Sequence, residues 1–243
     1  MVMDKIEEFK NLQNIGKIAN YNHGINGIMI KYTAEIFKKY IPSYKSSILE
    51  LGPAEGTMTD ILADIYNDYT IVEAVSEFCE VIKKNHKHIK VNNCLFENFN
   101  ASRKYDVIVL GHVLEHVENP IELLKKVKTW TKPNGLILAA VPNSNSIHRQ
   151  AAVLMGLLKE QNELGETDKL IGHRRVYNIE QLKSDFDKSK LSVYKYGGYF
   201  LKPLTNKQIE EQFSCEMVDA FMQLGEKYPE IAAEIYVIGK NIM

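Results

Sequence analysis

The segment Ser47-Ser-Ile-Leu-Glu-Leu-Gly-Pro-Ala-Glu-Gly56 decides the fold of this chain. An apolar run ends in an acidic residue, a glycine-rich turn follows, and a helix-like segment begins at Thr57. A second apolar run, Tyr69-Thr-Ile-Val-Glu73, ends in an acid 21 residues after Gly52. This order of strand, glycine turn, helix, strand and terminal acid is typical of half of a nucleotide-binding α/β domain.

The rest of the chain continues the alternation of short apolar runs and helical segments. This alternation predicts an α/β fold, with a mostly parallel sheet and helices on both faces. The expected strands are residues 47–51, 69–75, 90–94, 105–110 and 136–141, with helices at 57–66, 76–85 and 120–131. After an irregular stretch, a helix at 179–188, a strand at 191–200, a helical region at 206–227 and a strand at 234–239 complete the pattern.

Composition narrows the class of protein. A chain of 243 residues is long enough for one large α/β domain with a sizeable core. The net charge of -1 creates no field that would attract nucleic acid or an anionic membrane, so we expect neither as a partner. Three widely spaced cysteines, Cys79, Cys94 and Cys215, form no metal motif or disulfide framework. Their number, and an N-terminus without a signal-peptide apolar core, favour a cytoplasmic protein.

The glycine-rich turn indicates which ligand it binds. Backbone N–H groups at the start of the following helix are unpaired, and glycine lets a ligand approach them closely. Glu50, immediately before the turn, would repel a pyrophosphate but suits a cationic ligand, and Glu73 is placed to accept both ribose hydroxyls. S-adenosylmethionine, an adenosine with a positively charged tail, fits both acids.

These residues resemble the class I S-adenosylmethionine-dependent methyltransferases, strongly over residues 45–142. Glu50-Leu-Gly-Pro-Ala-Glu-Gly56 matches the acidic-x-Gly-x-Gly-x-Gly signature, with Ala54 in place of the middle glycine. Further matches are Glu73 (ribose acid), Cys94-Leu-Phe-Glu97 (adenine side), Asp106-Val-Ile-Val-Leu-Gly-His112 (fourth strand and catalytic end) and Lys132-Pro-Asn-Gly135 (turn before the fifth strand).

The resemblance implies a Rossmann-like, seven-stranded sheet whose last strand is antiparallel and lies beside the sixth. It also implies S-adenosylmethionine as cofactor and S-adenosylhomocysteine as product. The cofactor-binding residues that we expect are Tyr21, His23, Glu50, Gly52, Pro53, Ala54, Gly56, Glu73, Ala74, Leu95, Phe96, Gly111 and His112.

We expect a single methyltransferase domain in four parts. Residues 1–44 form an N-terminal helical cap, with helices near 4–15 and 24–40. The cofactor-binding core follows at 45–142, then a substrate lid insert at 143–178 and the C-terminal part of the sheet at 179–243.

Histidines gather where the methyl acceptor is expected, beyond the carboxyl ends of the strands. Four of them, His112, His116, His148 and His173, are candidate catalytic residues, with His116 or His173 the preferred base. Histidine transfers protons near neutral pH, and methylation of a hydroxyl requires loss of a proton, whereas a neutral amine needs no base. The histidines therefore favour O-methylation. The arginines Arg149, Arg174 and Arg175 are candidates to clamp an anionic substrate group.

The segment Leu114-Glu-His-Val117 allows two interpretations. It resembles the same segment of ubiquinone-pathway O-methyltransferases. It also resembles the Glu-x-x-Glu-His metal motif of small-RNA 2′-O-methyltransferases, with Glu115, His116 and His173 in the matching places and His112 in place of the first acid. A divalent metal is possible but not expected, because the same residues can orient a helix start.

The functional hypothesis is methyl transfer to a small-molecule hydroxyl, such as a sugar, a nucleotide-linked sugar or a related cell-envelope precursor, in small-molecule biosynthesis. The alternatives are an N-methyltransferase of a small metabolite, a metal-dependent RNA 2′-O-methyltransferase and a non-catalytic adenosyl-ligand binding protein. A homodimer is possible.

Overall fold

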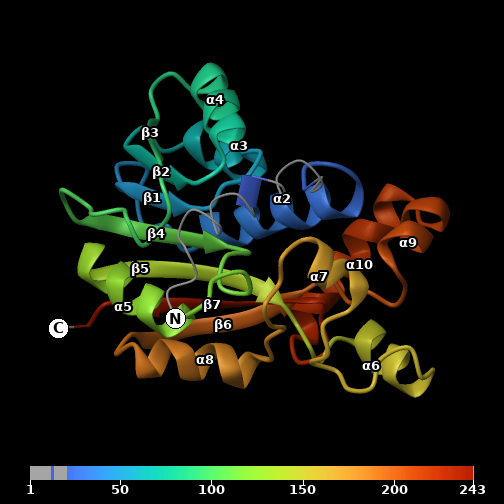
Figure 1. The fold of residues 1–243 in the computed structure, drawn as a ribbon. Helices are drawn as coiled ribbons and strands as arrows, with labels where there is room; N and C mark the ends of the chain where they lie inside the picture. Colours follow the sequence, from blue (N-terminus) through green and yellow to red (C-terminus); the bar gives the residue numbers. More distant parts are fainter. Residues whose placement is uncertain (1–11, 14–20, 243) are drawn as a thin grey trace.

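The computed structural model describes residues 12–13 and 21–242 (Figure 1). Most of the first predicted cap helix, residues 4–15, lies outside the described residues. The second cap helix is α2 (Gly24–Lys38).

The described strands form one seven-stranded sheet in the order β3-β2-β1-β4-β5-β7-β6 (Figure 1). The neighbours from β3 to β5 are parallel, whereas β7 runs antiparallel to both β5 and β6. The predicted Rossmann-like fold, with its last strand antiparallel and beside the sixth, is confirmed. The strands are β1 (Ile48–Leu51), β2 (Tyr69–Glu73), β3 (Lys90–Asn93), β4 (Tyr105–Gly111), β5 (Thr131–Pro142), β6 (Ser192–Tyr199) and β7 (Glu234–Lys240).

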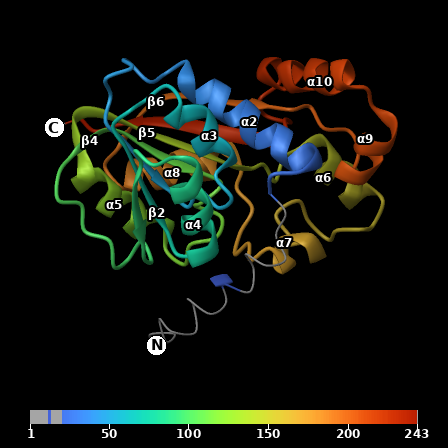
Figure 2. The ribbon, with the colours of Figure 1, turned by 90° about the horizontal axis from the view of Figure 1, so that it is seen from above.

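Alternate side chains of the central strands enter two separate cores. In β4, Val107 and Val109 belong to one core, and Ile108 and Leu110 to the other. The first core packs against α2, α3 (Thr57–Ala63) and α10 (Cys215–Lys227), and the second against α5 (Pro120–Trp130) and α8 (Ile179–Lys188) (Figure 2). Continuous apolar runs, rather than alternating ones, are what a sheet covered on both faces requires.

Strand β5 begins earlier than the sequence predicts. Tyr105 pairs with Thr131 and Val107 with Leu136, so the segment Lys132-Pro-Asn-Gly135 bulges within the strand instead of preceding it. The prediction failed because proline and glycine mark a turn without showing that pairing resumes on both sides of it.

The predicted helical region 206–227 is divided into α9 (Asn206–Gln212) and α10. The division falls at Ser214, whose hydroxyl accepts a hydrogen bond from the backbone N–H of Met217 and so caps the start of α10. Residues 143–178, which the sequence predicts to be a substrate lid and which are called the lid below, contain two short helices, α6 (Ile147–Leu154) and α7 (Glu166–Leu170). The remaining described helix of the core is α4 (Ser76–Asn85). Within the described ranges, no helix has the length and apolarity that crossing a membrane requires.

Three residues of the glycine-rich turn have backbone φ angles in the left-handed region. Gly52, Ala54 and Gly56 have φ values of 63°, 49° and 88°. The backbone N–H of Ala54 donates a 3.1 Å hydrogen bond to Glu73 Oε2, which holds the turn against the end of β2. Ala54, the departure from the family signature, is therefore a non-glycine residue in a conformation that suits glycine.

We expect Ala54→Gly to raise the free energy of unfolding by up to about 1 kcal/mol, because the relief of left-handed strain exceeds the extra entropy of the unfolded chain. The control is Ala220→Gly at an exposed position in the interior of α10, which should lower the free energy of unfolding by about 1 kcal/mol. Urea denaturation of both variants measures the two effects. A loss of stability in Ala54→Gly would contradict the assignment of strain.

Candidate active site

A cavity of about 970 Å³ lies at the carboxyl ends of the strands, lined by the glycine turn, α2, the end of β4 and the lid. Its volume suits a cofactor and a small acceptor together. Most residues predicted from the sequence line it: Tyr21, Glu50, Gly52, Pro53, Ala54, Glu73, Ala74, Leu95, Phe96, Gly111, His112, His116, His148 and His173.

Two predicted residues do not line the cavity. His23 precedes the first residue of α2 and is exposed. Gly56 is the N-cap of α3, and a Cβ there would lie 3.0 Å from Ile82 Cγ1, so this glycine serves the packing of α3. Sequence proximity to a motif could not reveal which way these residues face.

The turn end of the cavity has the features of an adenosyl site. A Cβ on Gly52 would lie 3.2 Å from Val113 Cγ2 and 3.3 Å from Phe96 Cζ, so a side chain would fill the space over the turn. Glu73 is 6% exposed and accepts hydrogen bonds from the backbone N–H groups of Ala54 and Val75, at 3.1 and 2.8 Å. Burial raises the pKa of Glu73, while these bonds oppose the rise.

The Glu50 carboxylate accepts hydrogen bonds from neighbouring side chains of the protein. Its Oε2 accepts hydrogen bonds from Thr59 Oγ1 at 2.6 Å and from the Tyr69 hydroxyl at 2.9 Å. Burial raises the pKa of Glu50 to about 7, against the opposing effect of both bonds. Glu50 therefore joins β1 to α3 and β2, and its contact with a cationic cofactor stays a prediction.

His112 lies directly after β4 in a left-handed conformation, with φ 57°. Its Nδ1 lies 3.5 Å from Glu115 Oε1 and 3.7 Å from Glu234 Oε2. Burial would lower the pKa of His112, but the two carboxylates outweigh it and the pKa is raised. Strained backbone of this kind concentrates at functional sites.

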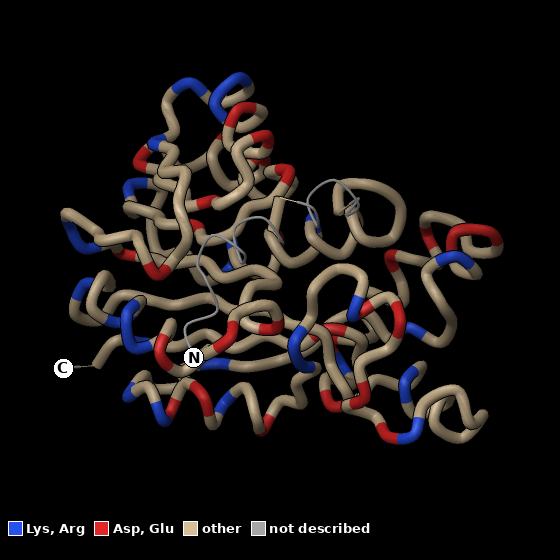
Figure 3. The backbone as a smooth tube through the Cα atoms, in the orientation of Figure 1, with Lys and Arg blue, Asp and Glu red and all other residues tan. Residues whose placement is uncertain are grey.

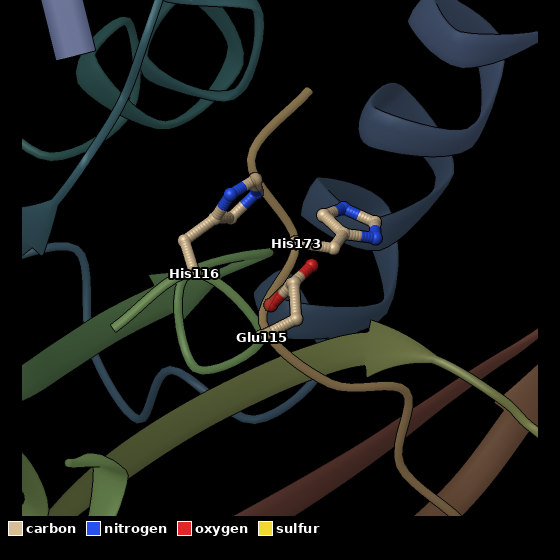
Figure 4. A group of neighbouring side chains, drawn as sticks. All are labelled: Glu115, His116 and His173. Carbon is tan, nitrogen blue, oxygen red and sulfur yellow. The ribbon is translucent and has the colours of Figure 1, made fainter. Parts of the chain in front are cut away.

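The lid brings His173 against the β4 end. The rings of His116 and His173 meet edge to face with their centroids 4.7 Å apart (Figure 4). His173 Nδ1 lies 3.2 Å from Asp168 Oδ1. Burial lowers the pKa of His116 to about 4, so its imidazole is neutral at pH 7. His173 has a carboxylate within ion-pair distance, the arrangement that orients a catalytic base, whereas Glu115 acts on His116 through its charge.

The same residues could hold a divalent ion. Ligand atoms of Glu115, His116 and His173 all lie within 4.8 Å of one another, and the three side chains point toward a common space (Figure 4). Both Glu115 oxygens are buried without a hydrogen bond, and two imidazoles with a carboxylate are a common donor set for transition metals. The donor set fits an ion, whose role there would be to orient the acceptor.

The three arginines that the sequence suggests as an anion clamp donate hydrogen bonds to backbone carbonyls, and Arg149 and Arg174 also line the cavity. Arg149 Nε donates to the carbonyl of Gln161 at 2.7 Å, and its Nη1 contacts Asp168 Oδ2 at 3.2 Å. Arg174 Nε donates to the carbonyl of His116, and Arg175 Nη1 to that of Leu114. These guanidinium groups hold the lid to itself and to the β4 loop, because a carbonyl-rich loop satisfies planar donors as well as a substrate anion does.

Three site residues were not predicted: Asp168, Lys202 and Glu234, all of which line the cavity. Glu234 is the first residue of an otherwise largely apolar strand. An acidic residue at the end of a buried strand could have indicated a site residue from the sequence alone. Lys202 and Asp168 lie in segments without periodicity, where the sequence offers no indication of position.

Comparisons with known proteins agree with this geometry. Residues 21–196 match the family described as "Methyltransferase domain". The chain belongs to this family. It is a class I S-adenosylmethionine-dependent methyltransferase, and S-adenosylmethionine is its cofactor.

Relatives support the family assignment. The ubiquinone biosynthesis O-methyltransferase of Rickettsia felis is 28% identical over 223 residues, which cover 88% of this chain and 87% of that protein. The malonyl-[acyl-carrier protein] O-methyltransferase of Halalkalibacterium halodurans is 23% identical, with 92% and 88% covered. A SAM-dependent methyltransferase of Thermotoga maritima, described as a possible histamine N-methyltransferase, has the same fold with a TM-score of 0.62, 13% identity and 97% and 95% coverage.

We expect Glu73→Gln to raise the dissociation constant of S-adenosylmethionine about 10- to 100-fold, because a charged acceptor for the ribose hydroxyls is lost. The single amide oxygen can still accept from the N–H of Ala54, but the amide nitrogen then faces the N–H of Val75, so thermal denaturation must first show that the variant is folded. Isothermal calorimetry measures the change, with the exposed Glu80→Gln on α4 as control. Equal affinity in both variants would show that Glu73 does not contact the ribose.

Acid should destabilise the fold through His148. Burial, followed by the charges of Lys202 and Arg149, lowers the pKa of His148 from 6.5 to about 3. The unfolded chain therefore takes up this proton first, and stability is lost as the pH falls below 6.5. Between pH 6.5 and 4.5 the free energy of unfolding of the wild type should fall by roughly 2 kcal/mol more than that of His148→Gln. Denaturation at several pH values tests this, with the exposed His23→Gln as control.

Proposed function

We propose that the enzyme methylates a hydroxyl of a small molecule, such as a sugar, a nucleotide-linked sugar or a related cell-envelope precursor. The observation that carries the proposal is a histidine with a carboxylate partner on each side of the acceptor space: His112 with Glu115, and His173 with Asp168. An oriented imidazole of this kind removes a hydroxyl proton.

The cofactor supplies an electrophilic methyl group on a sulfonium, and the remaining steps belong to the protein. Glu73 accepts from the ribose hydroxyls and Phe96 packs near the adenine. The buried cavity excludes water and aligns the acceptor oxygen, and such positioning supplies much of the rate. We assign the base to His112 Nε2, which is buried without a hydrogen-bond partner, with His173 as the second candidate.

The surface supports a small acceptor over RNA. Along the described backbone, the positions of Lys and Arg alternate with those of Asp and Glu (Figure 3). A nucleic-acid interface needs clustered Lys and Arg. Relatives named ubiquinone biosynthesis O-methyltransferase and malonyl-[acyl-carrier protein] O-methyltransferase also support transfer to oxygen.

N-methylation is the second candidate. It is favoured by the buried carboxylates Glu115 and Glu234, which could hold an ammonium group, and by the resemblance of the fold to a possible histamine N-methyltransferase.

We expect His112→Ala and His173→Ala to lower kcat for a hydroxyl acceptor by about 10²- to 10⁴-fold while cofactor affinity changes little. An amine acceptor should lose little rate near its own pKa, since it needs no base. His116→Ala, which removes an imidazole with a pKa of about 4, should have the smaller effect. Transfer from labelled S-adenosylmethionine to metabolite extracts, with and without chelator, identifies the acceptor and any metal requirement. Full activity of both alanine variants on a hydroxyl would refute the assignment.

A further inference from the structure

Buried polar atoms without hydrogen-bond partners gather at the lid end of the cavity. Native proteins leave few such atoms, so a group of them lining one cavity indicates a ligand that supplies the partners. Within the part of the chain that the structure describes, these atoms are His112 Nε2, Glu115 Oε2, His148 Nδ1 and Glu234 Oε2, all in residues that line the cavity.

Glu234 and Lys202 occupy the side of this group formed by the C-terminal half of the chain. Glu234 opens β7, pairs with Pro142 and Tyr199, and is 5% exposed. Lys202 follows β6, and its Nζ donates a 2.8 Å hydrogen bond to Asn206 Oδ1. Burial raises the pKa of Glu234, and the positive charges of His112 and Lys202 oppose that rise.

The mixture of charges selects the ligand chemistry. A carboxylate ligand would meet Glu234 and Glu115, and an ammonium ligand would meet Lys202, so either charge faces repulsion on one side. Neighbouring hydroxyls carry no charge and both donate and accept. They can satisfy a carboxylate oxygen and an ammonium group together.

We propose that Glu234 and Lys202 form a subsite that binds a vicinal diol of the acceptor, in which Glu234 accepts from one hydroxyl and Lys202 donates to its neighbour. The subsite holds the acceptor so that a different hydroxyl faces His112. This inference rests on the proposed function and specifies its acceptor as a polyhydroxylated molecule rather than a simple phenol, carboxylate or amine.

The test measures transfer from labelled S-adenosylmethionine to five probes: UDP-glucose, methyl α-D-mannopyranoside, phenol, histamine and succinate. The wild type should methylate a diol probe. Lys202→Met should raise KM for that probe at least about tenfold with kcat little changed, as loss of a charged hydrogen bond predicts. Glu234→Gln should raise KM by a similar factor and also change kcat, because it neutralises a carboxylate 3.7 Å from His112 Nδ1. The matched controls are Glu80→Gln and Lys207→Met, the same two substitutions at exposed positions outside the cavity.

A deoxy analogue of the active probe, lacking one hydroxyl of the diol, gives an independent readout. The wild type should lose affinity for it, and Glu234→Gln should lose little more, because the contact is already absent. Calorimetry with S-adenosylmethionine shows that each variant is folded and binds cofactor.

An unchanged KM in both variants, transfer to phenol, histamine or succinate alone, or transfer to no diol probe would overturn the subsite. The first result leaves the proposed function intact. Failure of the wild type to bind S-adenosylmethionine at all would instead contradict the assignment of the cofactor site.

Discussion

The hydrogen bonds of the Glu73 carboxylate are the constraint on which the cofactor end of the molecule depends. They join the end of β2 to the turn after β1 and fix the turn at Ala54, where the backbone is left-handed. A buried carboxylate needs donors, and backbone N–H groups of a tight turn supply them without a second side chain. Gly52, in the same turn, leaves no room for a side chain, because a Cβ there would lie 3.2 Å from Val113 Cγ2 and 3.3 Å from Phe96 Cζ.

The acceptor end depends on sheet topology. β7 is inserted between β5 and β6 and runs antiparallel to β5, so its first residue pairs with the last residue of β5. Glu234 therefore reaches the carboxyl edge of the parallel strands, within 3.7 Å of His112. An acid far from the glycine turn in the sequence thus reaches the same cavity, at the edge where open α/β sheets bind ligands.

Hydrogen bonds from three arginines connect the lid to the β4 loop and connect parts of the lid to one another. Arg149 joins α6 to the segment before α7, and Arg174 and Arg175 donate to carbonyls of the β4 loop. These contacts hold Asp168 and His173 against the end of β4. If His173 acts as the base that we propose, these arginines would orient it, because a catalytic side chain must be held within a fraction of an ångström of its productive position.

The sequence alone determined the α/β class, the cofactor turn, Glu73 and the histidines of the β4 end, because apolar periodicity and glycine at fixed spacing act locally. The sequence did not predict the bulge at residues 132–135, the exposure of His23 or the hydrogen bonds from the arginines to loop carbonyls. Each of these depends on which parts of the folded chain come into contact. Only the tertiary structure brought Asp168, Lys202 and Glu234 into the cavity. Their positions depend on how the chain crosses from one strand to another and on the insertion of β7 between β5 and β6. Contacts between residues so far apart in the chain produce no periodic pattern in the sequence.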